Sequence, residues 1–182
     1  LVWMCLPSRF WKATRKNLHQ DIQELVDKIY NEILSSGIGV TLYGRPGVGK
    51  TYIASILSKM FRANGKTVLF LSSTQLDWKS LSDIWYGEIS YFSRAKIVDL
   101  LVIDGIGSED YSEGWEKIYL FRAENLKPTI ITTTLDGENF VNTYGATFCR
   151  SISNAYVPIN IVGRDMRDVE TGNIRKKFKE EK

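Results

Sequence analysis

The chain of 182 residues is 43% hydrophobic and 25% charged, and its formal net charge is +3. These ordinary globular values exclude a chain that is disordered throughout, and the length predicts a single domain. The chain has no apolar run near the roughly 18 residues of a membrane span, and its two cysteines, Cys5 and Cys149, are far apart in sequence. We therefore expect no membrane contact, no disulfide framework and no cysteine metal site, in a cytoplasmic protein.

The first segment, residues 1–36, combines an aromatic and basic stretch with a helix. Single-stranded DNA could stack on the aromatic side chains and pair its phosphates with the basic ones, Arg9, Lys12, Arg15 and Lys16. The alternative, which we favour, is that the aromatic side chains pack this stretch onto the domain. From Asp21 onward, apolar residues recur at helical spacing and predict an amphipathic helix that ends near Gly37.

A glycine-rich sequence, GRPGVGKT, follows a strand predicted over residues 39–43 and precedes a predicted helix. This order is typical of a P-loop, in which backbone N–H groups surround phosphates while a lysine and a threonine reach the terminal phosphates and Mg²⁺. The sequence therefore predicts a site for a polyphosphate and its metal ion. The expected cofactor-binding residues are Gly44, Pro46, Gly47, Val48, Gly49, Lys50, Thr51 and Tyr52.

Two further apolar runs, residues 67–71 and 99–104, are typical of strands buried on both faces. The second run ends in Asp104, and an acid at this place in a P-loop protein holds Mg²⁺ together with the P-loop hydroxyl, here Thr51. Between the two runs, residues 72–80 are polar. The pattern over residues 81–97 predicts one or two helices.

The rest of the chain predicts a helix at 115–125, a strand at 129–134, a helix at 140–153 and a strand at 157–162. Pro158 indicates that the last strand lies at a sheet edge. Five strands with intervening helices predict a three-layer α/β P-loop NTPase of the additional-strand class, with a mostly parallel sheet. The core is expected to span residues 37–167. Only twenty residues follow the last predicted strand, so we expect a C-terminal lid to be reduced or absent, and residues 168–182 form a highly charged tail.

Four stretches make the chain resemble the AAA+ ATPase part of the bacterial helicase loaders DnaC and DnaI and of the related transposition helper IstB. They are residues 6–14, 37–51, 99–107 and 128–135. The resemblance implies an AAA+ fold that binds ATP or ADP with Mg²⁺ and self-associates through its ATP sites. It also implies a replicative helicase and single-stranded DNA as partners.

The resemblance also implies roles for single residues. Thr134 falls at the family's sensor asparagine, and Arg150 near the arginine that completes a neighbouring subunit's site. Arg167, with Arg164 as a looser match, falls near the γ-phosphate. The expected catalytic residues are Lys50, Asp104, Thr134, Arg150 and Arg167.

The chain departs from the family at position 105, where Gly105 replaces the acid that normally follows the Walker B aspartate. Since that acid polarises the attacking water, we expect an ATPase with slow turnover, and a restored glutamate is expected to raise it. Glu109 and Asp110 could substitute only if the loop folds them back toward the phosphate.

The sequence thus predicts an ATP-dependent helicase loader or remodeller in DNA replication, encoded by a cell, a phage or a mobile element. One alternative is a nucleotide-gated adaptor with little turnover, which Gly105 and Thr134 favour. Another is an IstB-like transposition helper that binds duplex DNA.

Overall fold

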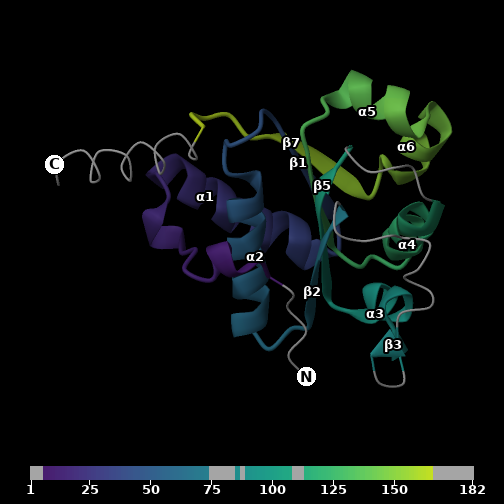
Figure 1. Ribbon diagram of the computed structural model, residues 1–182, viewed down its shortest axis with the longest axis horizontal. Helices are drawn as coiled ribbons and strands as arrows, with labels where there is room; N and C mark the ends of the chain where they lie inside the picture. Colours follow the sequence, from purple (N-terminus) through teal and green to yellow (C-terminus); the bar gives the residue numbers. More distant parts are fainter. Residues whose placement is uncertain (1–5, 74–84, 87–88, 108–112, 166–182) are drawn as a thin grey trace, which may run out of the picture.

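A computed structural model describes residues 6–73, 85–86, 89–107 and 113–165 of the chain. At its centre is a sheet of five parallel strands in the order β2-β5-β6-β1-β7 (Figure 1). The strands are β1 (Gly39–Tyr43), β2 (Val68–Ser72), β5 (Leu100–Ile106), β6 (Thr129–Thr133) and β7 (Tyr156–Asn160). The predicted α/β class is confirmed, and this sheet is parallel throughout rather than mostly parallel. The strand that contains Pro158 lies at an edge, as predicted.

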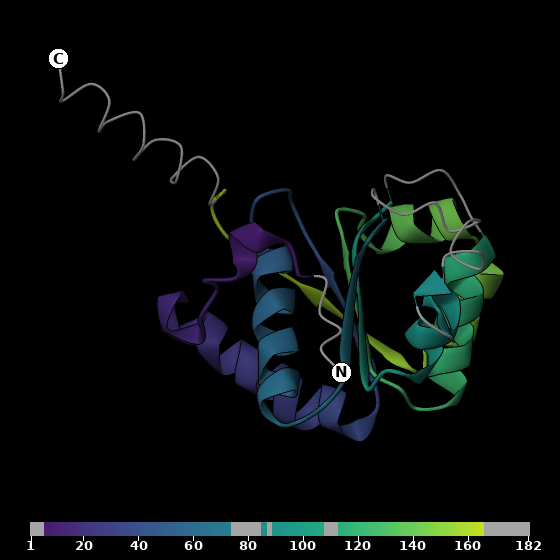
Figure 2. The same ribbon diagram turned by 60° about the horizontal axis from the view of Figure 1, so that its bottom comes forward.

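Helices cover both faces of the sheet and make the predicted three layers (Figures 1 and 2). One layer holds α1 (Gln20–Lys28) and α2 (Lys50–Ala63). The other holds α3 (Tyr91–Ile97), α4 (Glu113–Glu124), α5 (Gly137–Tyr144) and α6 (Ala146–Ile152). Shorter helical turns are η1 (Ser8–Phe10), η2 (Arg15–Asn17), η3 (Ile29–Ile33) and η4 (Leu34–Ser36). No helix in the described ranges has the length and apolar character needed to cross a bilayer.

The apolar run of β5 is buried on both of its faces. Leu100 and Val102 pack in the core cluster that contains residues of α1 and α2. Leu101 and Ile103 pack in the cluster on the opposite face, which contains residues of α3, α4 and α6. Because consecutive side chains of a strand point to opposite faces, a strand between two helix layers must be apolar at every position, and this is why its sequence predicts it well.

The prediction of one or two helices over residues 81–97 is wrong at residues 85–86 and 89–90. β3 (Trp85–Tyr86) and β4 (Ile89–Ser90) form a small antiparallel pair, and only α3 is helical. Tryptophan, tyrosine and isoleucine favour extended backbone, and this preference outweighs the weak helical periodicity. Residues 74–84 lie outside the described part of the chain.

The single helix predicted over residues 140–153 is two helices. Gly145 separates α5 from α6 with φ 85° and ψ 146°. This backbone conformation is open to glycine and strained for other residues, so the helix ends here and a new one begins in another direction.

Arg122 lies near the end of α4. It contacts the segments that lead into β5 and β6, at the opposite end of these strands from the glycine-rich loop. Its guanidinium donates hydrogen bonds to the carbonyls of Ala95 (2.8 Å), Val98 (2.9 Å) and Pro128 (2.8 Å) and to Oγ1 of Thr129 (2.9 Å). The side chain is 0% exposed, and burial lowers its pKa to about 10. Arg122 therefore remains charged at pH 7. Its hydrogen bonds connect α4 to the end of α3 and to the beginnings of β5 and β6.

Candidate nucleotide site

The glycine-rich loop connects the end of β1 to the beginning of α2, as the sequence predicts. Gly47 and Gly49 have φ angles of 82° and 99°, a left-handed conformation that glycine adopts without strain. Gly49 immediately precedes the first turn of α2, which is 14 residues long. The helix N-terminus, with its free N–H groups and partial positive charge, is thus directly next to the loop and favours an anion there.

Lys50 lies folded against this loop. Its Nζ donates to the carbonyl oxygens of Gly44 (2.7 Å) and Arg45 (2.8 Å), and only 8% of the residue is exposed. A buried ammonium group is stable only when its donors are satisfied, and here the loop's own carbonyls satisfy two of them. The loop therefore holds a positive charge at the place where the sequence predicts phosphates.

Thr51 and Asp104 come together across 53 residues of sequence. The Thr51 hydroxyl donates to Oδ1 of Asp104 at 2.8 Å. The same carboxylate oxygen accepts from the hydroxyl of Thr132 in β6 at 2.6 Å. A hydroxyl and a carboxylate are the hard oxygen ligands that Mg²⁺ prefers, so this pair fits the ion that accompanies a nucleotide.

Gly105 departs from regular strand geometry directly after Asp104. Its φ is 82°, and the register between β5 and β6 shifts between Ile103 and Ile106. The backbone is held from both sides: the N–H of Gly105 donates to Oγ1 of Thr132 (2.9 Å), and its carbonyl accepts from Oγ of Ser73 (2.6 Å). Gly105, which stands where the family carries an acid, therefore has a backbone conformation that suits glycine.

The structure shows Thr132 as a site residue that the sequence reasoning missed. The predicted sensor residue, Thr134, is exposed and follows the last residue of β6. The hydroxyl of the intervening Thr133 donates to the carbonyl of Ile106 at 2.8 Å. Thr132 holds both Asp104 and the peptide after it, and only the pairing of β6 with β5 indicates which of three consecutive threonines does so.

The structure describes two of the predicted arginines, Arg150 and Arg164, and both are exposed. Arg150 is exposed on α6, in the helix layer on the opposite face of the sheet from α2 (Figure 1). Arg164 is exposed beyond β7, in the segment in which Gly163 lies near Val48 and Asp165 lies against Gly47. Arg167, Glu109 and Asp110 lie outside the described residues. A role for Arg150 in a neighbouring subunit's site stays a prediction.

The segment before α1 is fastened to α2 beside the loop. Nζ of Lys59 donates to the carbonyls of Phe10 (3.0 Å), Trp11 (2.7 Å) and Ala13 (2.7 Å). The hydroxyl of Tyr52 accepts from the N–H of Thr14 at 3.1 Å. The interpretation that aromatic side chains pack this segment onto the domain is confirmed for Phe10, which packs against the core, whereas Trp11 remains 68% exposed.

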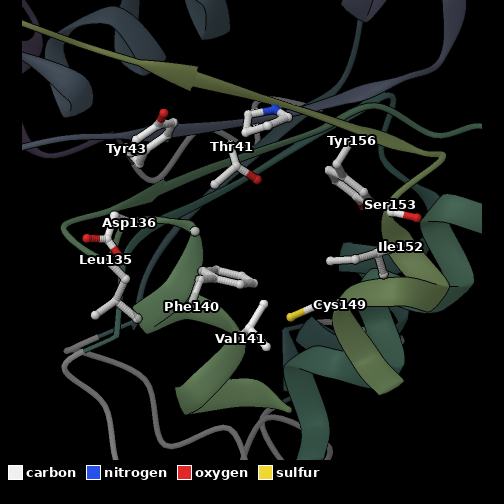
Figure 3. A pocket seen from close by; sticks show the side chains of 12 residues that line it. Thr41, Tyr43, Leu135, Asp136, Phe140, Val141, Cys149, Ile152, Ser153 and Tyr156 are labelled. Carbon is white, nitrogen blue, oxygen red and sulfur yellow. The ribbon is translucent and has the colours of Figure 1, made fainter. Parts of the chain in front are cut away.

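A separate apolar pocket of about 250 Å³ lies between the sheet and the pair α5 and α6. Figure 3 shows Phe140 and Cys149 facing Tyr156 across it. Burial raises the pKa of the Cys149 thiol, which keeps it protonated and unreactive. The pocket includes no residue of the glycine-rich loop, and its lining carries no arrangement for catalysis.

The five-stranded parallel sheet, the loop after β1 and the acid on β5 define an α/β P-loop fold of the AAA+ class. Solved structures confirm the resemblance to helicase loaders. The structure of DnaI has a TM-score of 0.72 and 18% sequence identity, covering 90% of this chain and 95% of DnaI. The DnaC helicase loader has a TM-score of 0.69 and 25% identity, covering 86% and 100%.

The initiator DnaA has a related fold. AMPPCP-bound DnaA from Aquifex aeolicus has a TM-score of 0.67 and 18% identity, covering 96% of this chain but 57% of DnaA. This chain thus corresponds to one part of that longer protein. No protein-family profile and no curated protein sequence matches the chain.

Proposed function

We propose that this protein is an ATP-binding helicase loader or remodeller in DNA replication, encoded by a cell, a phage or a mobile element. The observation that carries the proposal is the hydrogen bond that joins Thr51 to Asp104 beside a glycine loop. The fold shared with DnaI and the DnaC helicase loader supports the choice of function, and DnaA bound to AMPPCP supports the choice of ligand.

The described residues fit a nucleotide with Mg²⁺. The loop N–H groups and Lys50 would bind the phosphates, and Thr51 and Asp104 would hold the metal ion directly or through water. Mg²⁺, when bound, supplies charge that neutralises the terminal phosphates. Thr132 would keep the Asp104 carboxylate oriented toward Thr51. Lys50 would exchange the carbonyls of Gly44 and Arg45 for phosphate oxygens.

Replacing Lys50 with alanine is expected to weaken ATP binding about 10- to 150-fold. The change removes a charge-assisted contact worth roughly 1.5–3 kcal/mol. Calorimetric titration of ATP with Mg²⁺ into the folded Lys50→Ala variant measures the loss. Lys66→Ala, which removes an exposed lysine just after α2, is the matched control and should bind like the wild type. If Lys50→Ala and Lys66→Ala bind ATP with equal affinity, the proposal that the glycine-rich loop binds the nucleotide is contradicted.

We further propose that a replicative helicase is the protein partner and that ATP promotes self-association, with Arg150 reaching the next subunit's nucleotide and Arg167 lying near the γ-phosphate. The loader resemblance supports both, as does the exposed position of Arg150 on α6. In this arrangement the site of one subunit is completed by a neighbour.

Single-stranded DNA is the proposed second ligand, contacted by the exposed Trp11, Lys12 and Lys16. Arg15 contributes less, because it forms an ion pair with Asp27. Binding to a labelled oligonucleotide should fall by about 0.7 log units per phosphate contact for each tenfold rise in salt. The Lys12→Ala, Lys16→Ala double variant should lower that slope by about 1.4, whereas the Lys28→Ala, Lys66→Ala control should not.

The same titration separates the loader from an IstB-like helper. Preference for duplex over single-stranded DNA would favour the transposition function. Binding to neither strand form, or an unchanged salt slope in the first double variant, would contradict the DNA-binding surface proposed at Trp11.

A further inference from the structure

The chain after β7 runs along the glycine-rich loop. The N–H of Ile161 donates to the carbonyl of Tyr43 at 2.8 Å, and the carbonyl of Ile161 lies against Gly44. A Cβ added to Gly163 would lie 3.9 Å from the carbonyl of Val48. Figure 1 shows this segment leaving β7 and passing the connection between β1 and α2. Residues 161–165 therefore follow the loop that is proposed to bind phosphates.

The segment places a carboxylate on the loop itself. Both oxygens of Asp165 occupy the space into which a side chain on Gly47 would project, so the carboxylate touches the loop backbone. Gly47 has φ 82°, and the N-terminus of α2 follows two residues later. A loop of this kind attracts anions, and this accounts for the acidic side chain that lies against it.

We propose that Asp165 is an autoinhibitory latch that competes with the phosphates of the nucleotide for the glycine-rich loop. The inference rests on the proposed nucleotide binding at this loop. Two anions held on one loop repel each other, so bound phosphates push Asp165 away and, reciprocally, Asp165 lowers the affinity for phosphates.

Lys50 makes further contacts with the loop that bound phosphates would have to replace. Its ammonium is turned onto the carbonyls of Gly44 and Arg45, while the Asp165 carboxylate covers the loop at Gly47. A triphosphate must therefore change both arrangements when it binds. Adenosine carries no phosphate, so the charge of Asp165 should not lower its binding affinity.

Asp165→Asn keeps the size of the side chain and removes its charge, so it is expected to tighten ATP binding about tenfold, within the usual range for coupled sites. The gain should be smaller for ADP, absent for adenosine, and reduced at about 1 M salt, where charges separated by more than about 3 Å are screened. Asp165→Ser, a smaller neutral side chain, should show at least the same gain. Calorimetric titration of the three ligands measures these affinities.

Glu124→Gln is the matched control, since it neutralises an exposed acid at the end of α4 and should leave ATP affinity unchanged. If wild type and Asp165→Asn bind ATP equally, the latch is refuted while the nucleotide site stands. Weaker binding by Asp165→Asn would also refute it, because Asp165 would then assist the nucleotide. If neither the wild type nor any variant binds ATP, the proposed function itself fails.

Discussion

We expect steady-state ATP turnover to be about 10²- to 10⁴-fold slower than in an ATPase that carries a carboxylate directly after its Walker B aspartate. A positioned general base contributes a factor of this size, which corresponds to about 2.7–5.5 kcal/mol in the barrier. Asp104 is held by Thr51 and Thr132 in a position suited to Mg²⁺, but Gly105 offers no side chain to orient the attacking water. The protein is thus expected to bind ATP much better than it hydrolyses it.

Turnover of the wild type should be measured beside that of the Glu109→Gln, Asp110→Asn double variant, with ATP affinity as a control for folding. Slow turnover that is unchanged in the double variant agrees with the expectation. Brisk wild-type turnover that survives loss of both acids would contradict it. Slow turnover also supports the alternative of a nucleotide-gated adaptor.

The backbone conformation at Gly105 affects the outcome expected for the Gly105→Glu variant. Gly105 has φ 82°, and a side chain there costs about 1–2 kcal/mol because the left-handed conformation is unfavourable. A Cβ at this position would meet only Oγ of Ser73, at 3.6 Å, so space is not the obstacle. Gly105→Glu is therefore expected to lower stability, and the gain in turnover anticipated from sequence does not follow from adding the acid alone.

Replacing Arg122 with methionine should lower the free energy of unfolding by about 3–5 kcal/mol. Truncating a buried, hydrogen-bonded charged group has this effect because its partners are left without donors. The partners include the carbonyls of Ala95, Val98 and Pro128 and the hydroxyl of Thr129, all at the edge where α3 and α4 meet the sheet. Methionine preserves much of the volume, so the loss reflects the hydrogen bonds rather than a large cavity.

Urea unfolding of Arg122→Met and of a matched surface variant measures this difference. Lys127→Met is the control, since its ammonium donates to the carbonyl of Ile97 at 3.2 Å in an exposed position, and it should change stability by no more than about 0.5 kcal/mol. Equal losses in the two variants would show that Arg122 does not act as a buried clamp.

The sequence by itself determined the five strands of the central sheet, the glycine-rich loop and the acid on β5. β5 has to be apolar on both faces because helices cover both, and every residue from Leu100 to Ile103 is accordingly apolar. The loop needs glycine where φ is positive, and its spacing to Lys50 and Thr51 is local. Local constraints of this kind are visible in a sequence.

The meeting of Thr51 and Asp104 was predicted from sequence, whereas the tertiary structure alone decided two other contacts between distant residues. The pairing of β6 with β5 selects Thr132, rather than Thr134, as the partner of Asp104. The edge position of β7 brings Asp165 onto Gly47, although 118 residues of sequence separate them (165 minus 47). Such contacts depend on strand order and register, which arise from packing the whole sheet, and no short pattern in the chain encodes them.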